Sequence, residues 1–366
     1  MRKFTQPLAC SMFWLLSLLP LFLFTIDGPW PLARELRMQA RTPFPQRITP
    51  HVFRDFDRWF IDRIGLRRHL VSIGTAIHIG LLQHSTNQRV LIGRDGWLFY
   101  TDEGDSDGAA VMADFRGALR FTDSELRATE RNLLSMRNTF AACGVHGLVV
   151  VAPNKQSIYG EYLNSSGTRP ISRLDDLLSR INSPTRGMIL DLRVPLHTAK
   201  VAYPSHPLYF KTDTHWNDLG AFYAYQAIIN SLAQSMPISD FTLASLEQYE
   251  IDVKPFEGGD IAVNMLSSPG RFKDVQVLLN RKTVNAELRA KLGGQMLIVG
   301  DSFSNGLSHY FAQNYSVFRK VSFDDLPVPL FRAEGPQPVV VVFETVERYL
   351  TNMAKWDFDW KQFCPK

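Results

Sequence analysis

Four short runs of mostly apolar residues place the strongest limit on how this chain can fold. Each run is too short for a typical helix but suits a strand that is buried on both faces of a sheet. One segment with helical spacing, 122–142, precedes the first run, and another, 220–232, lies between the second and the third. Apolar strands that alternate with helices predict an α/β fold, with a parallel sheet covered by helices on both faces. The four runs are 147–153, 188–192, 296–299 and 339–343.

A serine follows the third run at a position that suits a nucleophile. The run continues directly into Gly300-Asp301-Ser302-Phe303-Ser304, and a helix-like segment, 305–311, comes next. On a tight turn from strand to helix, the hydroxyl of Ser302 would be exposed at the edge of the sheet. Free N–H groups at the start of the helix would lie beside it and could stabilise an oxyanion. This context predicts that Ser302 is a nucleophile.

The segment Asp213-Thr214-His215-Trp216-Asn217 offers the partners that a serine nucleophile requires. In an extended chain, residues two apart point the same way, so Asp213 and His215 could share one face. Asp213 could then orient the imidazole of His215, which could take the proton of Ser302. These three residues indicate a nucleophilic hydrolase or acyltransferase. Trp216 could either form a wall of this site or fill the core.

Three rival features are less suited to catalysis. A second Gly-Asp-Ser, 104–106, lies in the acidic run 102–108 with no apolar strand before it, which is typical of an exposed turn. His309 lies about two helical turns beyond Ser302, too far to take its proton, and is expected to be structural. The Asp213 and His215 pair could be half of a metal site, but no further ligand at suitable spacing supports one. We therefore expect no metal and no cofactor.

Composition excludes several classes of function. Of 366 residues, 45% are hydrophobic and 21% are charged, which is the balance of a globular protein with one large domain and room for a small one. The 40 basic and 36 acidic residues include no polybasic block, so nucleic acid is not an expected partner. The chain has no glycine-rich nucleotide-binding motif.

The N-terminus predicts a membrane segment. Arg2 and Lys3 precede the uncharged run 7–26, which has about the length that spans a bilayer. The run could be an uncleaved anchor, a cleaved signal peptide or a buried core helix, and the poor cleavage context after it favours the anchor. We expect an anchor at 1–28, a linker rich in Pro and Arg at 29–52, and an enzyme domain at 53–366 that lies outside the cytoplasm.

Two cysteines, Cys143 and Cys364, lie beyond the predicted anchor. In an oxidising compartment they could pair and fix the C-terminal tail. Alternatively, the two cysteines could stay unpaired, with one thiol buried and the other in a loose tail, and the sequence favours neither interpretation.

From about Phe53 to Leu350 the chain resembles the AlgJ/AlgX-type polysaccharide O-acetyltransferases, which are relatives of the SGNH hydrolases. The combination of Asp-Thr-His-Trp and Gly-Asp-Ser-Phe-Ser, in this order, is the most specific part of the resemblance. The residues that carry it are 60–67, 93–100, 153–159, 213–221, 300–304 and 343–348.

The resemblance implies an SGNH-hydrolase-like (flavodoxin-like) fold with Ser302 as nucleophile, His215 as base and Asp213 as orienting acid. Ordinary SGNH hydrolases carry the serine near the N-terminus, so the order Asp, His, Ser suggests a permuted sheet. Tyr310, Arg348 and Trp216 could contribute to substrate binding. Tyr310 is equally suited to the core, and Arg348 to an ion pair with Glu344 or Glu347 in its own segment.

The resemblance also implies a periplasmic enzyme, often anchored to the inner membrane, that acts on an exopolysaccharide such as alginate. Its acetyl donor would be a membrane-bound O-acyltransferase, and other exopolysaccharide-modification proteins would be partners. Two alternatives stay open: an acetylesterase that uses water in place of the sugar hydroxyl, and a non-catalytic polysaccharide-binding member of an export complex.

Overall fold

The computed structural model describes residues 51–61, 67–82, 84–101, 110–163, 170–236, 244–282, 294–326 and 339–365, together with residues 14, 15, 18 and 44. The chain divides into two compact units. The first comprises Met1–Thr86 and Ala262–Pro269, and the second comprises Asn87–Ile261 and Gly270–Lys366.

The described part of the first unit includes two helices. They are α2 (Val52–Ile61) and α3 (Arg67–Leu82). Most of the predicted anchor, 1–28, and most of the linker, 29–52, lie outside the described residues. In the part of the chain that is described, no helix combines the length and the apolar character needed to cross a membrane.

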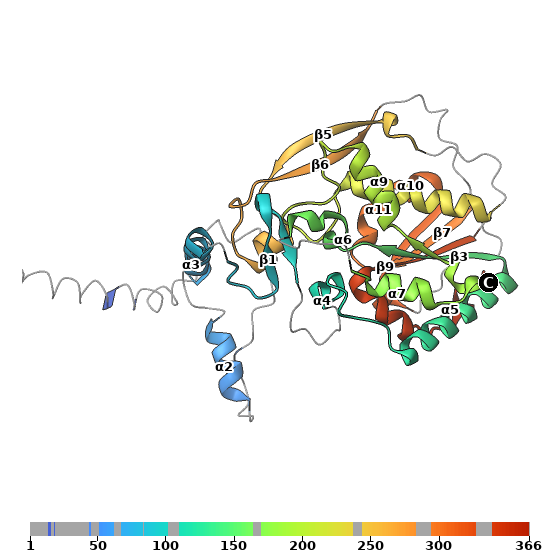
Figure 1. Ribbon diagram of the computed structural model, residues 1–366, viewed down its shortest axis with the longest axis horizontal. Helices are drawn as coiled ribbons and strands as arrows, with labels where there is room; N and C mark the ends of the chain where they lie inside the picture. Colours follow the sequence, from blue (N-terminus) through green and yellow to red (C-terminus); the bar gives the residue numbers. More distant parts are fainter. Residues whose placement is uncertain are drawn as a thin grey trace, which may run out of the picture. The chain divides into compact units, whose positions relative to one another are not determined.

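The second unit is built on a parallel sheet of five strands in the order β4-β3-β9-β7-β8 (Figure 1). All four predicted strands are confirmed. The edge strand β8 was missed, because Arg319 and Lys320 interrupt its apolar pattern and its residues are only partly buried. The strands are β3 (Val145–Ala152), β4 (Ile189–Asp191), β7 (Gln295–Gly300), β8 (Val317–Val321) and β9 (Val339–Val346).

Helices cover both faces of this sheet, as predicted. One face packs against α9 (Arg193–Ala202), α10 (Asp218–Ser235) and α11 (Ser304–Asn314), and the other against α5 (Asp123–Cys143) and α7 (Arg173–Arg180). The C-terminal 3₁₀ segments η9 (Glu347–Lys355) and η10 (Trp360–Phe363) complete the second layer.

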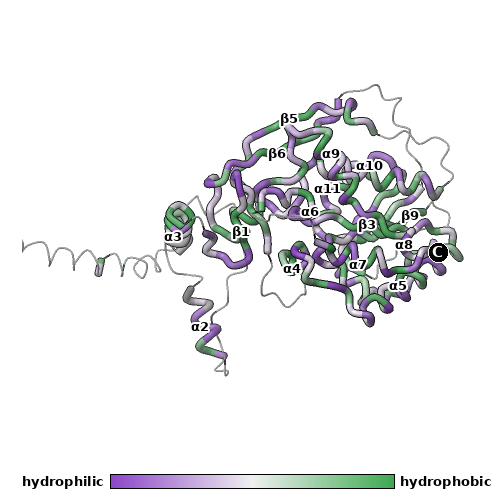
Figure 2. The backbone as a smooth tube through the Cα atoms, viewed as in Figure 1, coloured by the Kyte–Doolittle hydropathy of each residue, from purple (hydrophilic) through white to green (hydrophobic). Residues whose placement is uncertain are grey.

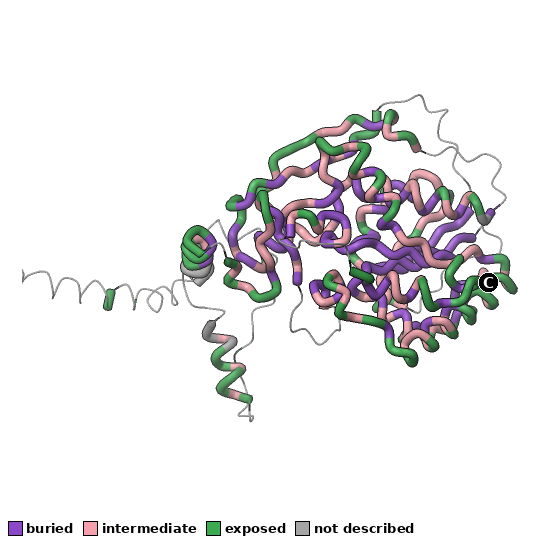
Figure 3. Tube along the Cα trace, viewed as in Figure 1, coloured by how far each residue is buried: buried purple, intermediate pink, exposed green. Residues whose placement is uncertain are grey.

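Strands β7 and β9 are mostly apolar and buried along their whole length, and β3 is buried from Leu148 to Ala152 (Figures 2 and 3). In β3, Leu148 and Val150 face the first helical layer, while Val149 and Val151 face the second. Burial of one such side chain stabilises the fold by about 1.5–3 kcal/mol. Two-sided burial explains why these strands read as continuous apolar runs in the sequence.

Helix α5 is capped at both ends. Thr122 caps its start, accepting the N–H of Glu125 while the Glu125 carboxylate accepts the N–H of Thr122. Gly144 ends the helix with φ 70°, a left-handed conformation that glycine adopts at little cost. Cys143, its last residue, forms a disulfide with Cys364, so the paired alternative is confirmed.

Residues 90–100 form a β-hairpin. Strands β1 (Val90–Ile92) and β2 (Leu98–Tyr100) pair antiparallel, and the turn holds Asp95 and Gly96 at positive φ. A second antiparallel pair, β5 (Tyr249–Phe256) with β6 (Asp274–Arg281), was not predicted. The second Gly-Asp-Ser, 104–106, lies outside the described residues. The remaining short elements are η3 (Arg94–Gly96), α4 (Val111–Phe115), α6 (Lys155–Tyr159), η4 (Gly160–Tyr162), α8 (Ser183–Arg186), η5 (Leu246–Gln248), η6 (Ile261–Met265) and η8 (Phe323–Asp325).

Candidate active site

Ser302 lies exposed at the carboxyl edge of the sheet, between β7 and α11. The strand ends at Gly300 and the helix begins at Ser304, so the predicted strand, turn and helix are all present. A side chain at position 300 would press on Glu344 Oε2, 2.8 Å from its Cβ, and on Ser304 Oγ at 2.9 Å. Glycine therefore permits the close approach of the turn to β9.

Asp301 fixes this turn. Its Oδ1 accepts the N–H of Phe303 at 2.8 Å, and its Oδ2 accepts the N–H of Val346, the last residue of β9, at 2.9 Å. The hydroxyl of Ser304 donates to the Asp301 carbonyl at 2.6 Å. The carboxylate thus ties the serine turn to the neighbouring strand, a role that the sequence pattern alone does not reveal.

The prediction of free N–H groups at the start of α11 is wrong for three residues. The N–H of Phe303 is bonded to the Asp301 carboxylate, and those of Ser304 and Asn305 donate to the carbonyls of Asp301 and Ser302 at 3.2 Å. A tight turn satisfies its own donors in this way. Within the described residues, the N–H of Ser302 itself is bonded to no acceptor.

His215 and Asp213 meet Ser302 in one hydrogen-bonded series. Nε2 of His215 lies 2.7 Å from Ser302 Oγ, and Nδ1 lies 2.6 Å from Asp213 Oδ1. The chain is bent here rather than extended, so the predicted reason for the pairing is wrong. Asp213 Oδ1 also accepts the backbone N–H of His215 at 3.0 Å, and this local turn brings the side chains together.

Asp260 supports the segment from outside, and sequence reasoning missed it. It accepts the N–H of Thr214 at 2.9 Å and the Thr214 hydroxyl at 3.0 Å, and its own N–H donates to Asp213 Oδ2 at 2.9 Å. Burial by itself would raise the pKa of Asp213, but the hydrogen bond and charge of His215 outweigh burial and hold this pKa well below its usual range. Burial and the nearby Asp213 raise the pKa of Asp260.

Asp213, His215 and Asp260 also offer three ligand atoms within 4.8 Å of one another. The sequence argument against a metal site rested on the lack of a third ligand, and that argument is wrong. The same atoms are nevertheless engaged as hydrogen-bond partners, since Asp213 binds His215 and Asp260, while both oxygens of Asp260 bind Thr214. The arrangement therefore suits proton transfer through His215.

Trp216 and Tyr310 belong to the core. Trp216 is 4% exposed and packs edge-on against Phe303, which also contacts the ring of His215 at a centroid distance of 4.9 Å. Tyr310 is 1% exposed, and its hydroxyl donates to the carbonyl of Asp218 at 3.1 Å. His309, expected to be structural, lies against Tyr310, and burial lowers its pKa.

Arg348 is buried beside the serine turn. Its guanidinium lies 5.5 Å from the ring centroid of Phe303 and 5.9 Å from that of Tyr100, and Nη1 donates to Asn154 Oδ1 at 3.3 Å. Within the described residues Arg348 forms no ion pair with Glu344 or Glu347, so the ion pair suggested by the sequence is not present.

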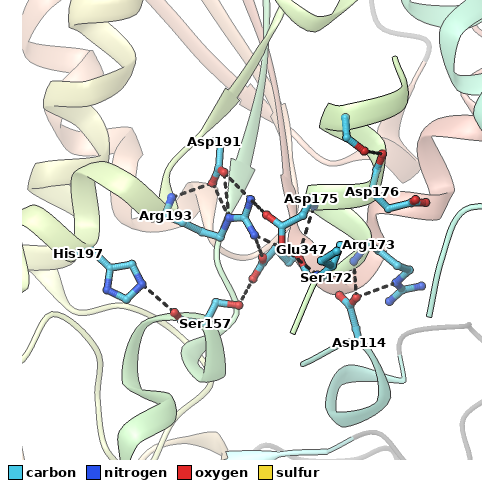
Figure 4. A network of polar contacts seen from close by, with 12 residues as sticks. Asp114, Ser157, Ser172, Arg173, Asp175, Asp176, Asp191, Arg193, His197 and Glu347 are labelled. Atoms are coloured by element: carbon cyan, nitrogen blue, oxygen red, sulfur yellow. Dashed lines mark hydrogen bonds and ion pairs between the residues drawn. The ribbon is translucent and has the colours of Figure 1, made fainter. Parts of the chain in front are cut away.

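Glu347 joins a buried polar network at the carboxyl ends of β3, β4 and β9 (Figure 4). It accepts the N–H of Asn154 at 2.8 Å and the hydroxyl of Ser157 at 2.5 Å, and lies 3.6 Å from Arg193. Arg193 also binds Asp191 at 2.6 Å. Burial raises the pKa of Glu347 to about 7, although Arg193, Ser157 and Asn154 each act to lower it. The network links the segments that follow β3, β4 and β9.

Several known proteins are similar to this chain. Residues 90–316 match the family described as SGNH hydrolase-like domain, acetyltransferase AlgX. A probable alginate O-acetylase AlgJ of Pseudomonas putida is 28% identical over 148 residues, which are 40% of this chain and 34% of that protein. The corresponding protein of Pseudomonas syringae pv. tomato is 26% identical over 316 residues, 74% of this chain and 72% of that protein. The chain therefore aligns with about a third of the first relative and nearly three quarters of the second.

Among solved structures, PatB1 of Bacillus cereus has a similar fold, with a TM-score of 0.51 and 14% identity over 72% of this chain and 96% of that one. The family match and the parallel sheet together confirm the predicted SGNH-hydrolase-like α/β fold.

Proposed function

The chain belongs to the family of SGNH hydrolase-like acetyltransferases that is described by AlgX, and we propose that it O-acetylates an exopolysaccharide through an acetyl-serine intermediate. The observation that carries the proposal is the series from Ser302 Oγ to His215 Nε2, 2.7 Å, and from His215 Nδ1 to Asp213 Oδ1, 2.6 Å. These distances suit transfer of the serine proton to an oriented imidazole.

In the first half-reaction, His215 takes the proton of Ser302 as Oγ attacks the carbonyl carbon of the acetyl donor. A tetrahedral oxyanion forms, and the N–H of Ser302 is available to donate to it. When the intermediate collapses, the bond to the donor breaks and His215 returns the proton to the leaving oxygen. The acetyl group is then bound to Ser302 as an ester.

In the second half-reaction, a hydroxyl of the polysaccharide attacks the acetyl-serine. His215 takes the proton of this hydroxyl and passes it to Ser302 Oγ as the sugar ester forms. Asp213 stabilises the imidazolium in both halves, which agrees with a pKa held below the usual range by the neighbouring His215.

The acceptor that the relatives suggest is alginate or a similar polymer, since both curated relatives are named probable alginate O-acetylases. Arg348, beside Phe303, is the proposed contact nearest to the acceptor site, while the buried Trp216 and Tyr310 would act only through packing. We also propose that the order of Asp213, His215 and Ser302 reflects a permuted sheet.

We place the enzyme in the periplasm. The disulfide between Cys143 and Cys364 supports an oxidising compartment. Residues 1–28 would anchor the chain in the inner membrane or be cleaved to release it, and residues 29–52 would link this segment to the enzyme at 53–366. A membrane-bound O-acyltransferase would supply the acetyl group, and other exopolysaccharide-modification proteins would be partners.

The proposal is tested by incubating the purified full chain with p-nitrophenyl acetate, with and without oligomannuronate. We expect an acetyl adduct on Ser302 by mass spectrometry and acetylated sugar when the acceptor is present. Ser302→Ala should abolish both, and Ser308→Ala, on the helix α11 that follows the serine turn, should abolish neither.

The outcomes separate the three functions. Ester cleavage without acetylated sugar would favour the acetylesterase. Sugar binding with no adduct and no cleavage would favour the non-catalytic binding protein. Ester cleavage that persists in Ser302→Ala would contradict the proposed nucleophile.

A further inference from the structure

A buried lysine, Lys155, lies under the segment that carries Asp213. It is the first residue of α6, which begins shortly after the end of β3, and its exposed fraction is 3%. Lysine is almost never fully buried unless its charge is paired or hydrogen-bonded. The series from Ser302 to Asp213 does not include this side chain, so its position requires another explanation.

All three donors of the ammonium are directed to one loop. Lys155 Nζ donates to the carbonyls of Phe210, Lys211 and Asp213 at 3.2, 2.9 and 2.6 Å. An ammonium group has three N–H donors, so a positively charged Lys155 can satisfy all three carbonyls at once. The shortest of these bonds is to the carbonyl of Asp213 itself.

The hairpin of β1 and β2 closes the other side of the ammonium. Lys155 Nζ lies 5.7 Å from the ring centroid of Trp97 and 5.3 Å from that of Phe99, distances at which an aromatic ring attracts a cation. The N–H of Leu98 donates to the carbonyl of Lys211 at 2.9 Å. The hairpin therefore contacts both the lysine and the loop that it holds.

We propose that Lys155 is a positioning residue for acetyl transfer, whose ammonium holds the loop from Phe210 to Asp213 in the shape that lets Asp213 meet His215. This inference rests on the proposed function of the Ser302 site. Loss of the ammonium leaves the carbonyls of Phe210 and Asp213 without this donor, while that of Lys211 keeps only the N–H of Leu98. The loop then relaxes, and the carboxylate of Asp213 moves from Nδ1 of His215.

Charged groups around Lys155 give the proposal a pH signature. The charged form of Lys155 is favoured by Asp213, Asp260 and Asp274. Burial disfavours this form more strongly, so the pKa of Lys155 is lowered to about 7. Lys211, the other cation near Trp97, points its ammonium to the carbonyl of Asp95. Above its pKa, the neutral amine of Lys155 has only two N–H donors for three carbonyls, so kcat should fall on the alkaline side.

Stability should change in the opposite direction over the same pH range. The pKa of Lys155 is lower in the folded chain than the ordinary value of 10.5, so between about pH 7 and 10.5 the unfolded chain binds more protons at this site. The contribution of Lys155 to the free energy of unfolding therefore rises with pH in this window. A decline of kcat there cannot be attributed to unfolding caused by Lys155.

The test compares Lys155→Met with Lys200→Met in the full chain. Lys200 is a matched control, because it also donates to a carbonyl, that of Ile158, and lies 4.4 Å from the Tyr159 ring centroid, but it does not contact the Asp213 loop. We expect Lys155→Met to lower kcat about 100-fold with little change in KM, as a misplaced catalytic group does. Lys200→Met should stay within about threefold of the wild type.

A second readout does not depend on turnover. The hydrogen bond between His215 Nδ1 and Asp213 gives a low-field proton NMR resonance, which should shift or disappear in Lys155→Met and persist in Lys200→Met. If Lys155→Met does not fold, the proposal is tested on the wild type alone. Its kcat and this resonance should change together between pH 6 and 10, while circular dichroism stays constant.

A folded Lys155→Met that keeps both its kcat and its low-field resonance would overturn the proposal, as would a wild type in which neither quantity changes up to pH 10. Absence of ester cleavage and acetyl transfer in the wild type would contradict the proposed function instead. In that case the resonance would still decide the role of Lys155.

Discussion

Ser302 Oγ lies 2.7 Å from His215 Nε2, although 87 residues separate the two positions in the sequence. Each residue is held by a different carboxylate: Asp301 binds the serine turn to β9, and Asp213 binds the imidazole. The contact therefore depends on two independently supported loops at one edge of the sheet. Changes that move either loop should affect the reaction without touching the reacting atoms.

Replacing Asp213 with Asn should lower kcat about 10³–10⁴-fold, because an amide neither stabilises the imidazolium nor fixes the tautomer of His215. KM should change much less, since the substrate does not bind to Asp213. The measurement is the rate of p-nitrophenyl acetate cleavage under saturating conditions. Asp252→Asn, on β5, is the matched control and should keep wild-type activity. A loss of less than tenfold in Asp213→Asn would exclude Asp213 as the orienting acid.

Replacing Gly259 with Ala should reduce activity although Gly259 contacts no reacting atom. A Cβ at this position would clash with Cβ and Oδ2 of Asp213, which are held in place by His215 and Asp260. The carboxylate must shift, and we expect a fall in kcat of about 100-fold. The rate of acetyl-serine formation, followed by mass spectrometry, is the direct measurement.

Gly187→Ala provides the comparison for Gly259→Ala. The nearest atom to a Cβ at Gly187 is the carbonyl oxygen of Ser183 at 3.7 Å, an ordinary contact. This variant should keep wild-type activity and stability. Equal activity in the two variants would mean that the position of Asp213 is not critical for the reaction.

Removing the disulfide should affect stability and spare the reaction. Cys143 and Cys364 are separated by 221 positions, and the bond links the end of α5 to the C-terminal tail. The double variant Cys143→Ser, Cys364→Ser should lose about 2–5 kcal/mol in the free energy of unfolding, measured in urea. Dithiothreitol should destabilise the wild type and leave the double variant unchanged. An effect of dithiothreitol on the double variant would show that another cysteine is responsible.

The sequence predicts the sheet strands that form a mostly apolar run, including the partly buried edge strand β4, and misses those that do not. Strands β3, β4, β7 and β9 read as continuous apolar runs, whereas β8 carries Arg319 and Lys320 at the edge of the sheet. The ribbon of β5 and β6 does have a signal, since Tyr249, Ile251 and Val253 alternate with polar residues. This alternation indicates a half-buried strand, which the prediction from apolar runs does not include.

The residues of the candidate site also divide into those that the sequence predicts and those that it does not. Asp213, His215 and Ser302 are predicted because their side-chain chemistry and local context are visible in short motifs. Asp260 and Lys155 are not, because each acts through contacts to a segment more than 40 positions away. A single sequence gives no register for such contacts, so residues that support a site are harder to find than residues that perform the chemistry.

The buried carboxylate of Glu347 gives a prediction for the pH dependence of stability. Burial raises its pKa to about 7 from an ordinary 4.5, so the folded chain binds more protons at this site than the unfolded chain between these values. The contribution of Glu347 to the free energy of unfolding is therefore complete below pH 4.5 and is lost as the pH rises through 7, with an upper limit of about 3 kcal/mol. Glu347→Gln lacks this titration, so urea unfolding at pH 5 and pH 8 should show a smaller decrease in stability than in the wild type. The exposed Glu250→Gln should keep the wild-type difference, and the same difference in Glu347→Gln would mean that this carboxyl group titrates at its ordinary pKa in the folded chain.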